Sequence, residues 1–144
     1  MLPSYVIPIV VLVVLFILTF RRKIWYEGYE SDHPVIQSIK LLLIKINPDL
    51  AKVDMRVANE SATMNKRTIF LCVYDENGKV YEMNTLIHVA LHEIAHLLSG
   101  VKLVNDEHDS EFRGIFYELL QKAEEAGIYN GSIPIPADYC KRAK

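Results

Sequence analysis

The sequence has few cysteines, since Cys72 and Cys140 are the only two among its 144 residues. Two cysteines are too few for the disulfide-rich scaffold of a small secreted domain, or for a four-cysteine zinc site. Their scarcity weakly favours a reducing compartment, whereas two glycosylation sequons, at Asn59 and Asn130, favour the opposite. Because such tripeptides often arise by chance, we give the distribution of charge more weight as a guide to location.

Charge is absent from the first part of the chain. Residues 2–20 carry none, and a basic Arg-Arg-Lys triplet follows at once. As a helix, these 19 residues would be about 28 Å long, close to the thickness of the hydrocarbon core of a bilayer. A cleavable signal peptide has its charges before the apolar run. The order seen here therefore predicts an uncleaved transmembrane anchor over residues 1–23, in contact with the lipid bilayer through residues 2–20.

The basic triplet also predicts an orientation. Positively charged residues stay on the cytoplasmic side of a membrane. We therefore expect a single-pass membrane protein with its N-terminus outside and residues 24–144 in the cytosol. The alternative is that residues 2–20 form a buried core helix, which fits less well because core helices are seldom apolar on every face over such a length.

An excess of basic residues is missing from the rest of the chain. All 18 acidic residues but only 13 of the 16 basic ones lie after residue 23, so residues 24–144 carry a net charge of −5. Nucleic-acid-binding surfaces are usually clearly basic. This balance argues against a nucleic-acid partner.

The remaining residues predict one small α+β domain. We assign residues 24–33 to a juxtamembrane linker and residues 34–144 to the domain. An apolar stripe predicts a helix over residues 34–46, with Asp32 or Ser31 as its N-cap. Strands are expected at residues 53–57, 68–74 and 79–83, the last two joined as a hairpin by the Asn77-Gly78 turn.

Two further helices are expected after the hairpin. The first carries the motif discussed next, and the second has apolar residues at 3.6-residue spacing, which predicts that one face packs against the core. The residues expected to cap or end these helices are, in chain order, Asn84 or Thr85, Gly100, Asp109 or Ser110, and Gly127.

A His-Glu-x-x-His motif lies in the stretch LHEIAHLLSG, residues 91–100. His92 and His96 are four residues apart, so both imidazoles lie on one helical face and can bind the same Zn²⁺ at about 2.0–2.1 Å. Glu93 is rotated around the helix, from where its carboxylate can reach a zinc-bound water. A chain of this composition would contain roughly 0.01 such motifs by chance. The motif therefore predicts a zinc site with Glu93 as the catalytic base.

The expected chemistry is peptide hydrolysis. Zinc lowers the pKa of its bound water, and Glu93 accepts the proton that this water releases. The resulting hydroxide attacks a carbonyl that zinc also polarises, and Glu93 then passes the proton to the leaving amine.

A catalytic zinc needs a third protein ligand. His88 shares the stripe of the motif, but it lies about 12 Å from His96 along the axis, so all three histidines of this helix cannot bind one ion. His108 follows a loop at the start of the last helix and would return to the metal if the two helices pack antiparallel. We favour His108 as the third metal ligand. The competing candidates are nearby carboxylates: Asp106, Glu107, Asp109 and Glu111.

The stretches HEIAHLLSG and HDSEFRGIFYELLQKA resemble the zincin metallopeptidases of the WLM and SprT-like families. Their pattern is His-Glu-x-x-His, a loop, and then a histidine shortly before the aromatic residue of a packed helix. His92, Glu93, His96, His108 and Phe112 match that pattern in order, and the resemblance covers about residues 68–126. It departs in two respects, because this chain has no cysteine-rich zinc ribbon and its domain is acidic, whereas many members act at DNA.

The resemblance implies a zincin-like fold and zinc-dependent hydrolysis of a protein or peptide substrate. It also suggests that the strand at residues 68–74 is the sheet edge that pairs with an extended substrate. The expected function is thus a membrane-anchored zinc metallopeptidase. The alternative is a non-catalytic zincin-like module whose structural zinc supports a membrane-bound adaptor or assembly role. An intact Glu93 favours the enzyme, because a structural zinc site has no use for a base.

Overall fold

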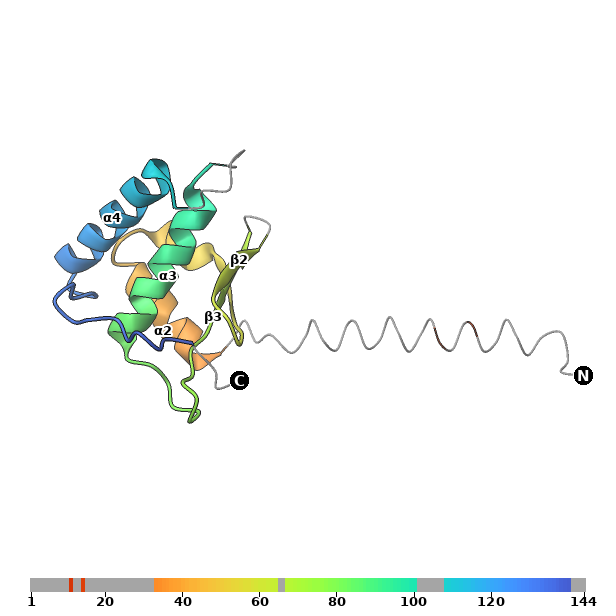
Figure 1. The fold of residues 1–144 in the computed structure, drawn as a ribbon. Helices are drawn as coiled ribbons and strands as arrows, with labels where there is room; N and C mark the ends of the chain where they lie inside the picture. The colour runs from red at the N-terminus through yellow and green to blue at the C-terminus, as the bar shows by residue number, and fades with distance from the viewer. Residues whose placement is uncertain (1–10, 12–13, 15–32, 65–66, 101–107, 141–144) are drawn as a thin grey trace, which may run out of the picture. The chain divides into compact units, whose positions relative to one another are not determined.

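The computed structural model describes residues 33–64, 67–100 and 108–140, together with Val11 and Val14. By compactness the chain divides into Met1–Glu30 and Ser31–Lys144, and the second unit is a small α+β domain (Figure 1). Its described elements are the helix α2 (Pro34–Leu43), the 3₁₀ helix η1 (Pro48–Lys52), the strands β1 (Asp54–Val57), β2 (Ala62–Met64) and β3 (Thr68–Leu71), and the helices α3 (Met83–Leu98) and α4 (Ser110–Glu125).

The three described strands form one sheet in the order β1-β3-β2. β1 runs parallel to β3, and β2 runs antiparallel to it. β3 is therefore the central strand, and the prediction that it forms the sheet edge is wrong. The cause is the short strand β2, which follows β1 in the chain and occupies the outer position beside β3.

The core lies between the sheet and the helices. α3 is packed between α4 and the sheet, and α2 contacts both α3 and β1 (Figure 1). One face of α2, one side of the strands and most of α3 contribute the side chains that are least exposed, namely Ile36, Ile39, Leu43, Met55, Ile69, Leu71, Ile87, Leu91 and Ile94. The 3.6-residue periodicity of α2 and α3 thus produces two apolar faces that pack against each other and against the sheet.

The N-cap of α2 differs from the predicted one. His33 occupies this position, where its Nδ1 accepts a hydrogen bond from the Val35 backbone N–H at 3.2 Å. Pro34 is the first helical residue, and its fixed φ angle suits that position, so the residue directly before it becomes the cap. The predicted caps, Ser31 and Asp32, lie outside the described residues.

The predicted hairpin forms only in part. The turn is confirmed, because Gly78 N–H donates to the Asp75 carbonyl at 3.1 Å and Gly78 has a φ of 77°, which glycine adopts readily. The expected return strand over residues 79–83 is reduced to one isolated bridge between Tyr74 and Val80, because α3 already begins at Met83.

The predicted helix caps are confirmed for α4 but not at the start of α3. Asp109 caps α4 as predicted, since its side chain accepts from Phe112 N–H at 2.9 Å. Gly127 follows the end of α4 with a φ of 69°, also as predicted. Asn84, in contrast, does not cap α3. The N-cap of that helix is Glu82, which makes no side-chain capping bond.

No helix in residues 33–64, 67–100 and 108–140 is long and apolar enough to cross a membrane. α2 has 10 residues and α3 and α4 have 16 each, whereas a span takes about 20 apolar residues. The predicted fold class and localisation are therefore wrong on this point. The described residues support neither a transmembrane helix nor a single-pass membrane protein with a cytosolic domain. Most of the predicted span, residues 2–20, lies outside the described residues.

The two cysteines form a disulfide, which is not among the features predicted from the sequence. Cys72 and Cys140 are 68 residues apart in sequence, and their Cα atoms lie 5.9 Å apart. Their small number therefore no longer argues for a reducing compartment.

Candidate metal centre

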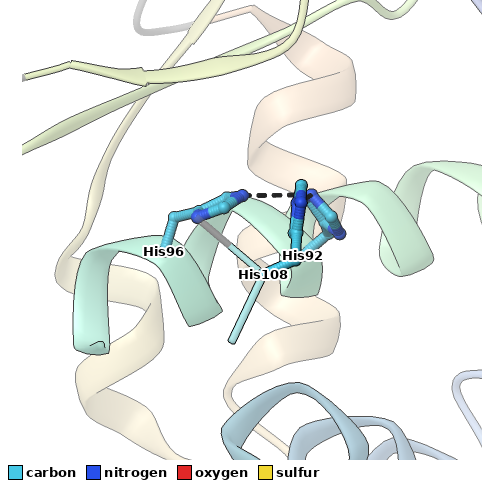
Figure 2. Close-up of side chains that lie close together, drawn as sticks. All are labelled: His92, His96 and His108. Carbon is cyan, nitrogen blue, oxygen red and sulfur yellow. Dashed lines mark hydrogen bonds between the residues drawn. The ribbon is translucent and has the colours of Figure 1, made fainter. Parts of the chain in front are cut away.

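Three imidazoles meet at the junction of α3 and α4 (Figure 2). His92 and His96 come from successive turns of α3, and His108 comes from the residue before the N-cap of α4. The Nε2 atom of His92 lies 3.2 Å from that of His96 and 3.3 Å from that of His108. The antiparallel return of the chain that the sequence analysis expected thus brings His108 beside the motif.

The position of His108 follows from the local structure of α4. The Asp109 side chain caps the helix through Phe112 N–H, which fixes the first turn of α4 and the residue before it. Phe112 is 2 % exposed and anchors that turn in the core. His108 itself is exposed.

Phe112 also forms the base of the site. Its ring centroid lies 5.0 Å from that of His92, 4.3 Å from that of His96 and 4.8 Å from that of His108. One buried ring therefore contacts all three imidazoles and restricts their rotation. The sequence pattern named Phe112 as part of a motif, but it did not indicate this triple contact.

The imidazole of His92 is held in its neutral form. Burial, the largest cause, and the repulsion of like charge by the neighbouring imidazoles together lower the pKa of His92 to about 4. A metal ion binds a neutral imidazole through a free lone pair. At neutral pH, His92 is thus already in the form that a metal requires.

The spacing of the nitrogens fits a tetrahedral ion. Two donors that are each about 2.0–2.1 Å from a zinc ion at the tetrahedral angle are about 3.3 Å apart. The two Nε2–Nε2 distances of 3.2 and 3.3 Å match this value. In the described part of the chain, His92, His96 and His108 form the one group of three donors close enough to hold a metal ion. The donor set therefore fits zinc.

The carboxylates considered as third ligands have other roles where they are described. Asp109 Oδ1 accepts from Phe112 N–H, and Glu111 Oε1 accepts from Gly100 N–H at 3.3 Å. Asp106 and Glu107 lie outside the described residues. Among the described candidates, only His108 reaches the nitrogen of His92.

Glu93 is buried beside the histidines, with 6 % of its surface exposed. The Thr63 hydroxyl lies 2.8 Å from Glu93 Oε2 and 2.9 Å from the Glu93 backbone carbonyl, and it can donate to either. Thr63 belongs to the short strand β2, so the sheet contacts the expected base directly. The sequence gives no signal for Thr63, because three residues are too few to show a strand periodicity.

His88 faces a different environment from the other two histidines of α3. Its Nδ1 lies 3.1 Å from the Tyr129 hydroxyl, and its ring packs edge-on against Phe116 at a centroid distance of 5.2 Å. Burial lowers the pKa of His88 as well. The structure thus places His88 in a packed aromatic cluster and outside the group of three donors.

Comparison with known proteins gives relatives without a described function. The chain is 38 % identical over 96 residues to an uncharacterized protein 136R of Invertebrate iridescent virus 6, a match that covers 63 % of this chain and 51 % of the relative. It is 39 % identical over 82 residues to an uncharacterized protein 042R of Invertebrate iridescent virus 3, covering 56 % and 49 %. The chain thus spans about half the length of these curated relatives. No family model and no solved structure matches it.

Proposed function

We propose that residues 34–144 form a zinc-dependent metallopeptidase that hydrolyses peptide bonds in a protein or peptide substrate. The observation that carries this proposal is the spacing of the three ring nitrogens beside the buried Glu93. Structural zinc sites usually take four protein ligands, whereas catalytic sites take three and leave one position for water. A set of three histidines therefore favours a catalytic site, and the resemblance to the zincin families points the same way.

The residues around the proposed zinc site would have distinct roles in the reaction. Zinc held by the three imidazoles would supply an acidified water and polarise the substrate carbonyl. The Glu93 carboxylate would take the proton from the attacking water and deliver it to the leaving amine. Thr63, through its hydroxyl, would keep one oxygen of that carboxylate in place.

We propose that the substrate binds at the outer edge of β2. β2 is an outer strand of the sheet, and its central residue, Thr63, contacts Glu93. An extended peptide that added itself as a further strand beside β2 would pass close to the proposed base. This edge replaces β3, which is covered on both sides by its neighbouring strands.

The test compares the parent protein with Glu93→Gln. The measurements are the zinc content of the full chain and its hydrolysis of fluorescently labelled casein. We expect the variant to keep its zinc and to lose about 10²–10⁴-fold in turnover, because glutamine is nearly isosteric but cannot accept the proton. Glu118→Gln is the matched control, since it makes the same chemical change on the exposed surface of α4, where Glu118 pairs with Lys122.

Two outcomes would count against the proposal. Equal hydrolysis by the parent and Glu93→Gln would exclude Glu93 as the base. Zinc binding by both proteins without hydrolysis by either would favour the alternative, a non-catalytic zinc module with an adaptor role.

A further inference from the structure

The segment after α4 is fastened to the domain at both of its described ends. Near its start, Asn130 N–H donates to Asn84 Oδ1 at 2.8 Å, and Asn84 Nδ2 donates back to the Asn130 carbonyl at 3.2 Å. At its far end, Cys140 is bonded to Cys72, just after β3. Residues 128–140 contain no helix or strand, so side-chain contacts of this kind, and not a regular hydrogen-bond ladder, hold the segment to the domain.

The far end also makes a hydrogen-bonded ring with the start of β2. The Tyr139 hydroxyl donates to the Cys72 carbonyl at 2.7 Å and lies 2.9 Å from Ser61 Oγ. A phenol has a single proton, which the Cys72 carbonyl receives, so Ser61 must be the donor in its contact with Tyr139. Ser61 Oγ in turn accepts from Cys72 N–H at 3.0 Å. Each of these polar groups is thus paired, and the hydrogen bonds join Tyr139 to Ser61, the residue before β2.

The backbone at this point needs outside support. Cys140 has a φ of 54°, a left-handed conformation that is unfavourable for a non-glycine residue. Its N–H donates to the Tyr81 hydroxyl at 2.9 Å, and the Tyr139 ring packs on the Tyr81 ring at a centroid distance of 4.8 Å. The disulfide and these contacts hold the residue in place together.

The strand β2 connects the hydrogen bonds of Tyr139 to the proposed base, Glu93. Ser61 precedes the strand, and Thr63, two residues later, contacts the Glu93 carboxylate. β2 has only three residues, and β3 is its one partner among the described strands, so its own ladder constrains it weakly. A second constraint at Ser61 would therefore affect where the Thr63 hydroxyl lies.

We propose that Tyr139 and the Cys72–Cys140 disulfide form a clasp that positions β2, so that Thr63 holds the Glu93 carboxylate for proton transfer. Tyr139 and Thr63 are positioning residues in this scheme, because they act through Glu93. The catalytic part of the inference rests on the proposed peptidase function. The structural part, that the clasp determines the position of β2, stands independently of it.

The test uses four variants of the zinc-loaded full chain and one control variant. Tyr139→Phe removes one hydroxyl from the clasp and keeps the ring on Tyr81, and Cys140→Ser removes the disulfide. Thr63→Val removes the hydroxyl that contacts Glu93 with little change in shape, and Thr63→Ser restores it. Tyr117→Phe is the matched control, since Tyr117 is 64 % exposed on α4.

We expect casein hydrolysis to reveal the positioning role. A hydrogen bond to a charged group is worth about 1.5–3 kcal/mol, so Thr63→Val should lower kcat about 10- to 100-fold. KM and zinc affinity should stay within about twofold, and Thr63→Ser should recover most of the lost rate. Tyr139→Phe should lower kcat in the same manner but less, and Tyr117→Phe should leave it unchanged.

Hydrogen–deuterium exchange tests the structural part without any assay of activity. Tyr139→Phe and Cys140→Ser should both speed exchange at residues 61–64 and at the Cys72 amide, while α4 exchanges as in the parent. Unchanged exchange at β2 in both variants would overturn the clasp. Faster exchange at β2 with an unchanged kcat would overturn its link to Glu93. A parent protein that hydrolyses nothing but shows the expected exchange would refute the peptidase function and leave the structural part standing.

Discussion

The two halves of α3 carry the same residue type on the same face but differ in what faces them. His88 near the N-terminal end lies among Tyr129 and Phe116, where a phenol satisfies its Nδ1. His92 and His96 lie one and two turns further along, where a third imidazole from another element joins them. Helical spacing alone therefore does not make a metal site. Whether a metal site forms depends on the element that packs opposite, because that element provides either a further lone pair for the metal or a hydrogen-bond partner for the histidine.

The largest expected effect would come from removing the third imidazole. His108→Ala should weaken zinc binding by more than about 100-fold, because loss of a direct ligand should cost more than the 10- to 100-fold that loss of a ligand's outer partner costs. Competition with a chromophoric chelator measures the affinity. Tight zinc binding by this variant would show that the C-terminal half of α3 completes its site in another way, with a carboxylate as the first candidate.

The next effect concerns the ring under the three histidines. Phe112→Ala should lower the free energy of unfolding by about 3–5 kcal/mol, because it removes a ring that is 2 % exposed from the core. It should also weaken zinc binding, since the imidazoles lose the surface that orders them. Urea unfolding with and without zinc measures both effects. A stability loss without any change in zinc affinity would show that the histidines are ordered independently of Phe112.

A smaller effect is expected at the N-terminal half of the same stripe. His88→Ala should reduce zinc affinity by less than about tenfold and stability by about 1 kcal/mol, the usual contribution of one hydrogen bond. The same titration that serves His108→Ala measures this affinity. Comparable losses in the two variants would remove the contrast between the halves of α3.

The smallest effect is a change in pH dependence. Burial lowers the pKa of His88 below its usual value of about 6.5, so the unfolded chain binds a proton more readily than the folded one. The contribution of neutral His88 to the free energy of unfolding is therefore fully present above about pH 6.5. It is lost as the pH falls through the lowered pKa that His88 has in the folded state. In the metal-free protein, His88→Gln should therefore reduce the difference in unfolding free energy between pH 7 and pH 5. A difference as large as in the parent would assign the acid sensitivity to other groups.

Local signals in the sequence were sufficient for several features of the domain. The periodicity of α2, α3 and α4, the capping of α4 by Asp109, the turn at Gly78 and the helix end at Gly127 all depend on residues within a few positions of one another. The spacing of His92 and His96 belongs to this class too, since a helix fixes the relation between residues four apart. The apolar run at residues 2–20 is also a local signal, but the membrane topology predicted from it is wrong.

Contacts between distant residues were decided by the tertiary structure. The sequence contained no sign of β2, and without it neither the central position of β3 nor the contact between Thr63 and Glu93 could be foreseen. Asn84 is a residue type that often caps helices, but its side chain forms hydrogen bonds with the backbone of Asn130, 46 residues later in the chain. Cys72 and Cys140 likewise pair across 68 residues. The physical reason is common to all three, because side-chain chemistry shows what a residue can bind, whereas the packing of the whole chain determines which partner comes within reach.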